Sequence, residues 1–201
     1  MFRRATATLL SLVASSGPLI TLAQNGDQLH EMIATEEGFI AMDTPKDWQR
    51  ANGPGLAFFL RAKDSVETAP VFMYLSATPY GPNEDAKTGN DVISSDIADF
   101  KKRFRNGVAQ KDEDIELPRA KAQATVYTFL SGEAHNAFEK IAYIREANRM
   151  LIVCLSAKND VEFRGSNATF ESFVRSYGGS IVAAPSHPTE LPSREKQSGL
   201  L

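Results

Sequence analysis

The hydrophobic positions fall into short runs separated by polar and turn-forming residues, which predicts a mixed α and β structure. Residues 150–155 (MLIVCL) are all apolar, too few for a buried helix and rich in strand formers, so they predict a central strand covered on both faces. Residues 138–146 mix apolar and charged side chains as a half-solvated strand does, and Ala147-Asn148 predicts a two-residue hairpin turn between the two runs.

Similar runs predict further strands over 38–42, 56–61, 71–77 and 122–130, and 181–183 is a weaker candidate for a short terminal strand. The loops that join the first three of these strands are short enough for antiparallel pairing among them. The predicted sheet is therefore largely antiparallel.

Two amphipathic helices are predicted from apolar residues at helical spacing. The first begins near Asn90 and closes at Asn106-Gly107, and its apolar face is formed by Ile93, Ile97, Phe100 and Phe104. The second is capped at its start by Ser166 or Asn167 and closed by Gly178-Gly179, and its apolar face is formed by Phe170, Phe173, Val174 and Tyr177. A brief helical turn is also indicated by Leu29, Met32 and Ile33.

The first 23 residues have the pattern of a secretory signal peptide. Arg3 and Arg4 form a short basic region, residues 5–22 are mostly apolar or small, and the residues up to Ala23 suit signal peptidase. The alternative is an uncleaved anchor, but Gly17-Pro18 interrupts a stretch that falls short of a span of about 18 strongly apolar residues. We expect cleavage after Ala23 and export with no membrane span left, by general secretion in preference to the twin-arginine route.

The chain then divides into four parts: the signal peptide (1–23), an N-terminal segment (24–35), one domain (36–180) and a disordered proline-rich tail (181–201). The formal net charge of −3 gives no electrostatic case for a nucleic-acid partner. Cys154 is the only cysteine, which excludes an internal disulfide. Its place in the apolar run favours a small core residue over a thiol that pairs with another protein.

No catalytic, cofactor-binding or metal-binding residues are predicted, because the known motifs are missing. The three histidines (His30, His135 and His187) are scattered and lack metal-ligand spacing. The acidic run 112–114 lacks the alternating oxygen ligands and the glycine turn of a calcium loop. A serine or threonine nucleophile acting with His135 stays open, since catalytic triads are defined by geometry.

Three further features have ordinary structural interpretations. The basic run at 101–105 favours the C-terminal end of a helix dipole over an anion site. Asn167 begins a glycosylation pattern, but a capping role is favoured. Trp48, the only tryptophan, is expected to fold onto the core at a strand end, with a role in recognition as the alternative.

The order of elements resembles PsbP-like domains and the Ran-binding import factors that share their fold. The segment GFIAMDTPKDW is similar to their opening strand, which runs to a proline and a tryptophan. FEKIAYIREANRMLIVCLSA followed by TFESFVRSY resembles their late hairpin and last helix. The resemblance implies an α+β fold in which an antiparallel sheet lies between helices on both sides, an α-β-α sandwich. It implies no site, since no photosystem-specific or Ran-specific motif is present.

Two functions from different classes remain. An exported, non-catalytic binding or assembly factor, with another envelope or extracellular protein as its partner, explains the absence of catalytic motifs, the signal peptide and the resemblance. The alternative is an envelope enzyme of hydrolase type with a site that is not visible in the sequence.

Overall fold

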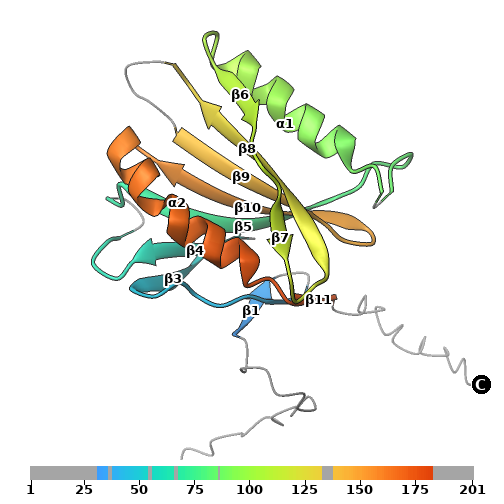
Figure 1. Cartoon of the computed structure of the whole chain (residues 1–201), viewed down its shortest axis with the longest axis horizontal. Helices are drawn as coiled ribbons and strands as arrows, with labels where there is room; N and C mark the ends of the chain where they lie inside the picture. The colour runs from blue at the N-terminus through green and yellow to red at the C-terminus, as the bar shows by residue number, and fades with distance from the viewer. Residues whose placement is uncertain are drawn as a thin grey trace, which may run out of the picture.

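The computed structural model describes residues 31–35, 38–53, 56–65, 68–85, 87–132 and 138–182. Its main feature is an antiparallel sheet (Figure 1). The strands follow the order β3 (Trp48–Gly53), β4 (Leu56–Arg61), β5 (Val71–Pro79), β10 (Arg149–Ala157), β9 (Phe138–Arg145), β8 (Ala122–Leu130) and β6 (Val108–Lys111). A short strand, β7 (Ile115–Leu117), also pairs with β8. The predicted antiparallel α+β fold is therefore confirmed at this level.

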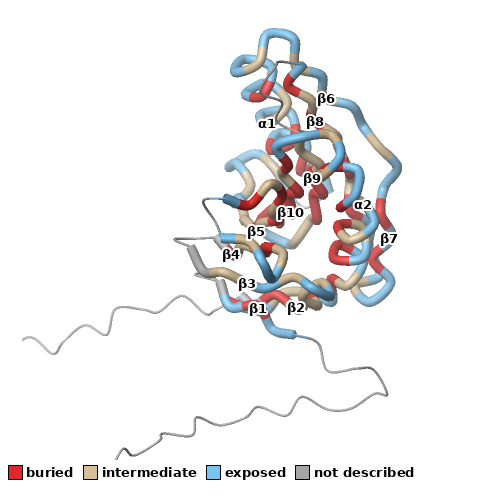
Figure 2. Tube along the Cα trace, turned by 90° about the vertical axis from the view of Figure 1, so that its left-hand side faces the viewer, coloured by how far each residue is buried: buried red, intermediate tan, exposed pale blue. Residues whose placement is uncertain are grey.

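The predicted central strand is confirmed as β10, which pairs with β5 on one side and β9 on the other. The turn at Ala147-Asn148 is also confirmed, since the Glu146 N–H donates to the Arg149 carbonyl at 3.0 Å across a two-residue loop. Figure 2 shows that the buried positions are concentrated on β9 and β10. An uninterrupted apolar run is thus explained by burial of both faces of one strand.

Alternate side chains of β10 enter two hydrophobic clusters, as the two-residue period of a strand requires. Leu151, Val153 and Leu155 join a cluster that includes the apolar face of α2 (Asp160–Arg175). Met150, Ile152 and Cys154 join a second cluster that includes the apolar face of α1 (Asn90–Arg103). Both predicted helices are therefore present, and each contributes its apolar residues to one of the two clusters.

Helix α2 begins earlier than predicted, and the prediction of Ser166 or Asn167 as its N-cap is wrong. The cap is Asn159, whose side-chain oxygen accepts a hydrogen bond from the Glu162 N–H at 2.9 Å. Ser166 is instead buried in the middle of the helix, where its hydroxyl accepts a hydrogen bond from Arg61 at 3.2 Å.

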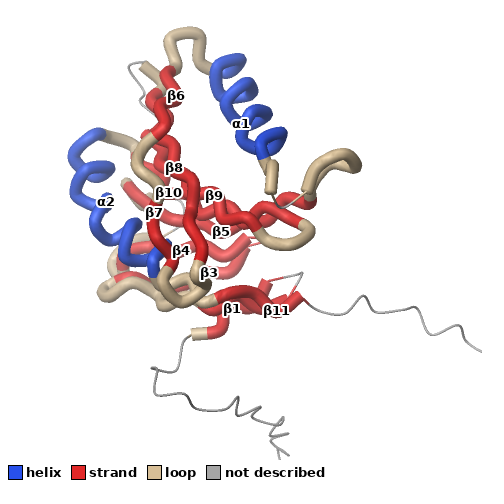
Figure 3. Tube along the Cα trace, turned by 45° about the vertical axis from the view of Figure 1, so that its right-hand side comes forward, coloured by secondary structure: helices blue, strands red, loops and turns tan. Residues whose placement is uncertain are grey.

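A separate three-stranded sheet is formed by β1 (Met32–Thr35), β2 (Gly38–Ala41) and β11 (Gly179–Val182). Figure 3 shows β1 and β11 together at one end of the large sheet. The predicted helical turn at Met32 and Ile33 is wrong, because these residues pair with β2. The expected pairing of 38–42 with 56–61 is also wrong, since β2 pairs with β1 and β11. Ile33 and Ile40 bury one face of this sheet in the main core.

Besides β1, which was predicted as a helical turn, the sequence prediction omitted β3, β6 and β7. Their residues lack a clear apolar run, and each is held by pairing with a neighbour, β3 with β4 and both β6 and β7 with the longer β8. Trp48 begins β3 and packs against the core cluster of α2, so its predicted structural role is confirmed.

Candidate functional site: a groove between α1 and the sheet

A groove of about 770 Å³ lies between α1 and the sheet. Its floor is built by β5, β10, β9 and β8, and one wall is the polar side of α1. Strand register places Tyr74, Cys154 and Ile141 in one row across the floor, because paired residues of adjacent strands point to the same face. The volume falls in the range of sites that take small molecules or protein side chains.

An aromatic cluster adjoins the groove on the side of β4 and β5. The ring centroids of Phe58 and Phe72 each lie 6.2 Å from that of Tyr74, which lines the groove. All three side chains are half-buried. At the other end of the floor, Phe129 meets Phe100 of α1 edge to face at 5.1 Å. The groove therefore offers apolar surface at both ends.

Two half-buried carboxylates, Asp96 and Glu139, face the groove from different elements, and a third, Asp99 of α1, lines its exposed wall. Asp96 of α1 accepts a hydrogen bond from the Tyr143 hydroxyl at 3.0 Å, and Glu139 comes from β9. Burial raises the pKa of Asp96 above its ordinary value, against the opposing effect of the Tyr143 hydrogen bond. Burial likewise raises the pKa of Glu139, and the charge of Asp96 adds to this rise. Ionising either carboxyl group therefore requires more free energy in this groove than in water.

The cations of the groove lie on its more exposed wall. Lys102 and Arg103 are exposed residues at the C-terminal end of α1. The Arg103 guanidinium lies 5.8 Å from the centre of the Phe104 ring. It makes no ion pair with any carboxylate among the described residues, although its charge opposes the rise in the pKa of Glu139 that burial causes.

The thiol beneath the floor is not a nucleophile in this arrangement. Cys154 is fully buried, as predicted, and lies beside Tyr74 in the strand register. Burial raises the pKa of Cys154 well above that of a free thiol, and the charge of Glu139 raises it further. A thiol held neutral and out of reach of solvent serves as packing.

The residues considered for chemistry in the sequence fall partly outside the part of the chain that the structure describes. His30, His135 and His187 lie outside the described residues. The acidic run 112–114 is engaged locally: Asp112 accepts from Thr128 at 2.6 Å and Asp114 pairs with Lys111 at 3.4 Å. Over the described ranges, no three His, Cys, Asp or Glu side chains are grouped so that they could hold a metal ion.

No helix in the described part of the chain has the length and apolar character that a membrane crossing requires.

A second cavity, of about 490 Å³, lies where the β9–β10 hairpin meets the end of α2. Here Glu146 accepts a hydrogen bond from the Tyr177 hydroxyl at 2.7 Å and another from Ser180. It also forms a buried ion pair with Arg149 at 2.6 Å. Because Glu146 has these internal donors, we interpret this cluster as the structural joint between the hairpin and β11.

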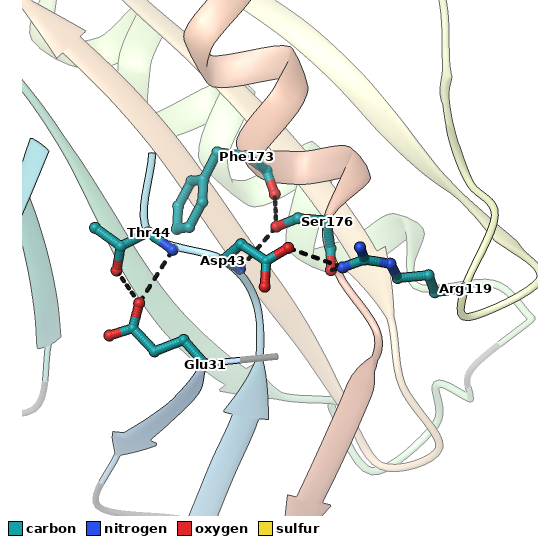
Figure 4. A network of polar contacts seen from close by, with 6 residues as sticks. All are labelled: Glu31, Asp43, Thr44, Arg119, Phe173 and Ser176. Carbon is teal, nitrogen blue, oxygen red and sulfur yellow. Dashed lines mark hydrogen bonds and ion pairs between the residues drawn. The ribbon is translucent and has the colours of Figure 1, made fainter. Parts of the chain in front are cut away.

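A neighbouring polar network has a similar joining role (Figure 4). The Asp43 N–H donates to the Ser176 hydroxyl at 3.0 Å, and Arg119 donates both to the Asp43 carboxylate at 3.0 Å and to the Ser176 carbonyl at 3.1 Å. The Thr44 N–H and hydroxyl both donate to Glu31. The network ties the segment after β2 to the end of α2 and the turn before β8.

Sequence reasoning missed the groove because its residues carry no motif. Tyr74 and Ser76 follow buried residues along β5, and Thr78 continues the same face, so they signal one half-solvated strand face and nothing more. Asp96 is a polar residue on the otherwise apolar face of the predicted helix, and that irregularity was the only signal for it. Lys102 and Arg103 were interpreted as a helix end, which is confirmed, but they also form the groove wall.

A scan against known family models gives no match, and neither does a search of curated proteins. Among solved structures, the chain is similar to a protein from Bacteroides thetaiotaomicron, with a TM-score of 0.44, 13% identity and coverage of 74% of this chain. The chain spans 46% of that protein, about half its length. It is also similar to the Ran-binding protein Mog1p of Saccharomyces cerevisiae and to a mutant of protein Mog1, each with a TM-score of 0.44, 12% identity and coverage of 74% of this chain and 87% of that one.

Proposed function

We propose that this protein is an exported, non-catalytic binding factor whose partner, another envelope or extracellular protein, inserts a side chain into the groove beneath α1. The observation that carries the proposal is the groove itself, which combines about 770 Å³ of space with aromatic and aliphatic side chains and with polar and charged groups from α1, β5 and β9. The volume lies in the range of binding sites. The hydroxyls of Ser76 and Thr78, which line the groove, form no hydrogen bond with a carboxylate of the described residues.

The fold is consistent with a binding role. We infer an α-β-α sandwich of the PsbP-like kind. This is supported by α1 and α2, which pack on the two alternating side-chain sets of β10 and lie on different sides of the strands in Figure 3. In such an arrangement α1 is the wall of a site, and the rest of the fold is a rigid support.

Export is proposed from the first 23 residues alone. The test is the intact mass of the protein recovered from outside the cytoplasm, which should correspond to a chain that begins at Gln24. A mass that still includes residues 2–22 would contradict cleavage and would make the protein a tethered one.

The binding role is tested by filling the groove. Ser76→Trp places an indole on the groove floor, and Val161→Trp places the same side chain on the exposed side of α2 as a matched control. Both variants and the natural protein would be used to capture partners from native envelope extract, with mass spectrometry of the bound proteins. We expect a partner that the natural protein and the Val161 variant retain and the Ser76 variant loses. Equal capture by all three would refute the groove as the binding site.

A second candidate function is an envelope enzyme of hydrolase type. The observation that favours it is the pair of carboxylates with raised pKa values in the groove, Asp96 and Glu139, since such groups are frequent at active sites. It requires turnover of ester, peptide or phosphate substrates that is abolished by His135→Ala or Glu139→Gln. Absence of turnover in the natural protein would leave the binding role.

A further inference from the structure

We propose that the groove binds a lysine side chain of the partner, with its ammonium group between Asp96 and Glu139 and its alkyl stem on the apolar floor. The inference rests on the proposed binding function and specifies the chemistry that the groove recognises. It requires a negative inner site, an apolar path to that site, and no internal cation that already occupies it.

The inner site is negative because Asp96 and Glu139 approach it from different elements, α1 and β9. Both are half-buried, and Asp96 has one described donor, the Tyr143 hydroxyl at 3.0 Å. Among the described residues, no hydrogen bond or ion pair engages the Glu139 side chain. A bound cation would offset the cost of holding two carboxylates near each other in apolar surroundings.

The cations that the fold supplies do not occupy this position. Lys102 and Arg103 are exposed on the outer wall of the groove, and the Arg103 guanidinium lies over the Phe104 ring at 5.8 Å. Neither forms an ion pair with a described carboxylate. The charge of Arg103 opposes the rise in pKa that burial causes in both Asp96 and Glu139, but its guanidinium forms no ion pair with either carboxylate, so the position between them is not filled by a described cation.

The path to the carboxylates suits a long alkyl stem that ends in a compact charge. Ile141 and Ile152 provide an aliphatic floor, and Tyr74 with its two aromatic neighbours provides ring faces at the edge. A lysine stem buries its methylene groups along such a surface and presents three N–H donors at its end. An ammonium group also gains from nearby aromatic faces.

The test uses three capped tripeptides of the form Gly-X-Gly, with lysine, norleucine or glutamate in the middle. Binding to the full mature chain is followed by chemical-shift changes of the Ser76 and Ile141 amides. We expect the lysine peptide to bind about tenfold or more tightly than norleucine, the factor expected when a charge-assisted hydrogen bond is lost. The variants Glu139→Gln and Asp96→Asn should weaken lysine binding by a similar factor.

The control is Glu113→Gln, which removes the same charge at an exposed position outside the groove. It should leave lysine binding unchanged. Thermal melts establish that each variant is folded, and Glu139→Gln carries the test if Asp96→Asn does not fold.

The other possible results of the peptide titration contradict lysine binding. Equal binding of lysine and norleucine would show an apolar site, and tighter binding of glutamate would assign the groove to anions through Lys102 and Arg103. If no tripeptide shifts the groove amides while Ser76→Trp still abolishes partner capture, the lysine inference fails and the binding function stands. If Ser76→Trp also leaves capture intact, the proposed function itself fails.

Discussion

The buried ion pair at the β9–β10 hairpin gives a sharp test of how the central hairpin is anchored. The Arg149 side chain is 4% exposed and that of Glu146 is 9% exposed, and Nε lies 2.6 Å from Oε2. Replacing Arg149 with Met keeps most of the volume but leaves the Glu146 charge without its cation. Breaking a buried pair in this way costs about 3–5 kcal/mol. Because Tyr177 and Ser180 still donate to Glu146, we expect the lower end, about 3 kcal/mol.

The matched control is Arg164→Met on the surface of α2. Arg164 pairs with Asp160 through the same atom type at 2.8 Å, but its side chain is 77% exposed. An exposed pair of this kind contributes little, so the control should leave stability unchanged within error. The two arginines differ mainly in burial, which isolates that factor.

The assay is urea unfolding followed by the fluorescence of Trp48, the only tryptophan and a residue packed on the core. With a slope of about 2 kcal/mol per molar urea, a loss of 3 kcal/mol lowers the midpoint by about 1.5 M. The double variant Arg149→Met with Glu146→Gln should recover part of the loss, because no uncompensated charge remains. Equal midpoints for Arg149→Met and Arg164→Met would refute the role assigned to burial.

Three other predictions follow from the same structure. Cys154 should react with a thiol reagent only after denaturation, because burial raises its pKa and excludes the reagent; rapid native labelling would show that β10 is not a core strand. Leu151→Asp should lower the free energy of unfolding by more than about 4 kcal/mol, because a charge at this fully buried position has no partner. A circular dichroism spectrum like that of the natural protein would contradict this prediction. Burial raises the pKa of Glu139 in the folded state. The protonated Glu139 side chain therefore stabilises the fold at pH values below its pKa in the unfolded chain, about 4.3. This stabilisation is lost as the pH rises through the pKa of the folded state. Glu139→Gln should therefore melt higher than the natural protein at pH 7, and a lower melting temperature there would count against the burial of this carboxylate.

The local elements could be read from the sequence where one residue period was unambiguous. The apolar run at 150–155 and the turn after Glu146 are local patterns, and both are found as β10 and its hairpin. Helix α1 was placed by its four-three-four spacing for the same reason. The start of α2 was missed because Asn159 caps the helix well upstream of the apolar residues that revealed it.

Pairing and grouping were decided by the tertiary structure. The chain from 38 to 42 is a strand by composition, but its partners are β1 and β11, and β11 joins it from the other end of the chain. Short strands such as β1 bury too little by themselves to leave a clear pattern, so their structure depends on the neighbours that cover them.

The sequence by itself determined a chain of ordinary composition with a buried central strand, two amphipathic helices and no known catalytic motif. Only the tertiary structure decided where a ligand could enter. Tyr143 and Asp96 are 47 residues apart along the chain and meet at 3.0 Å because α1 folds back over β9. The periodicity of the sequence shows which face of a single helix or strand is buried. A groove is formed by faces of different elements, and the packing of the whole sheet decides which faces meet.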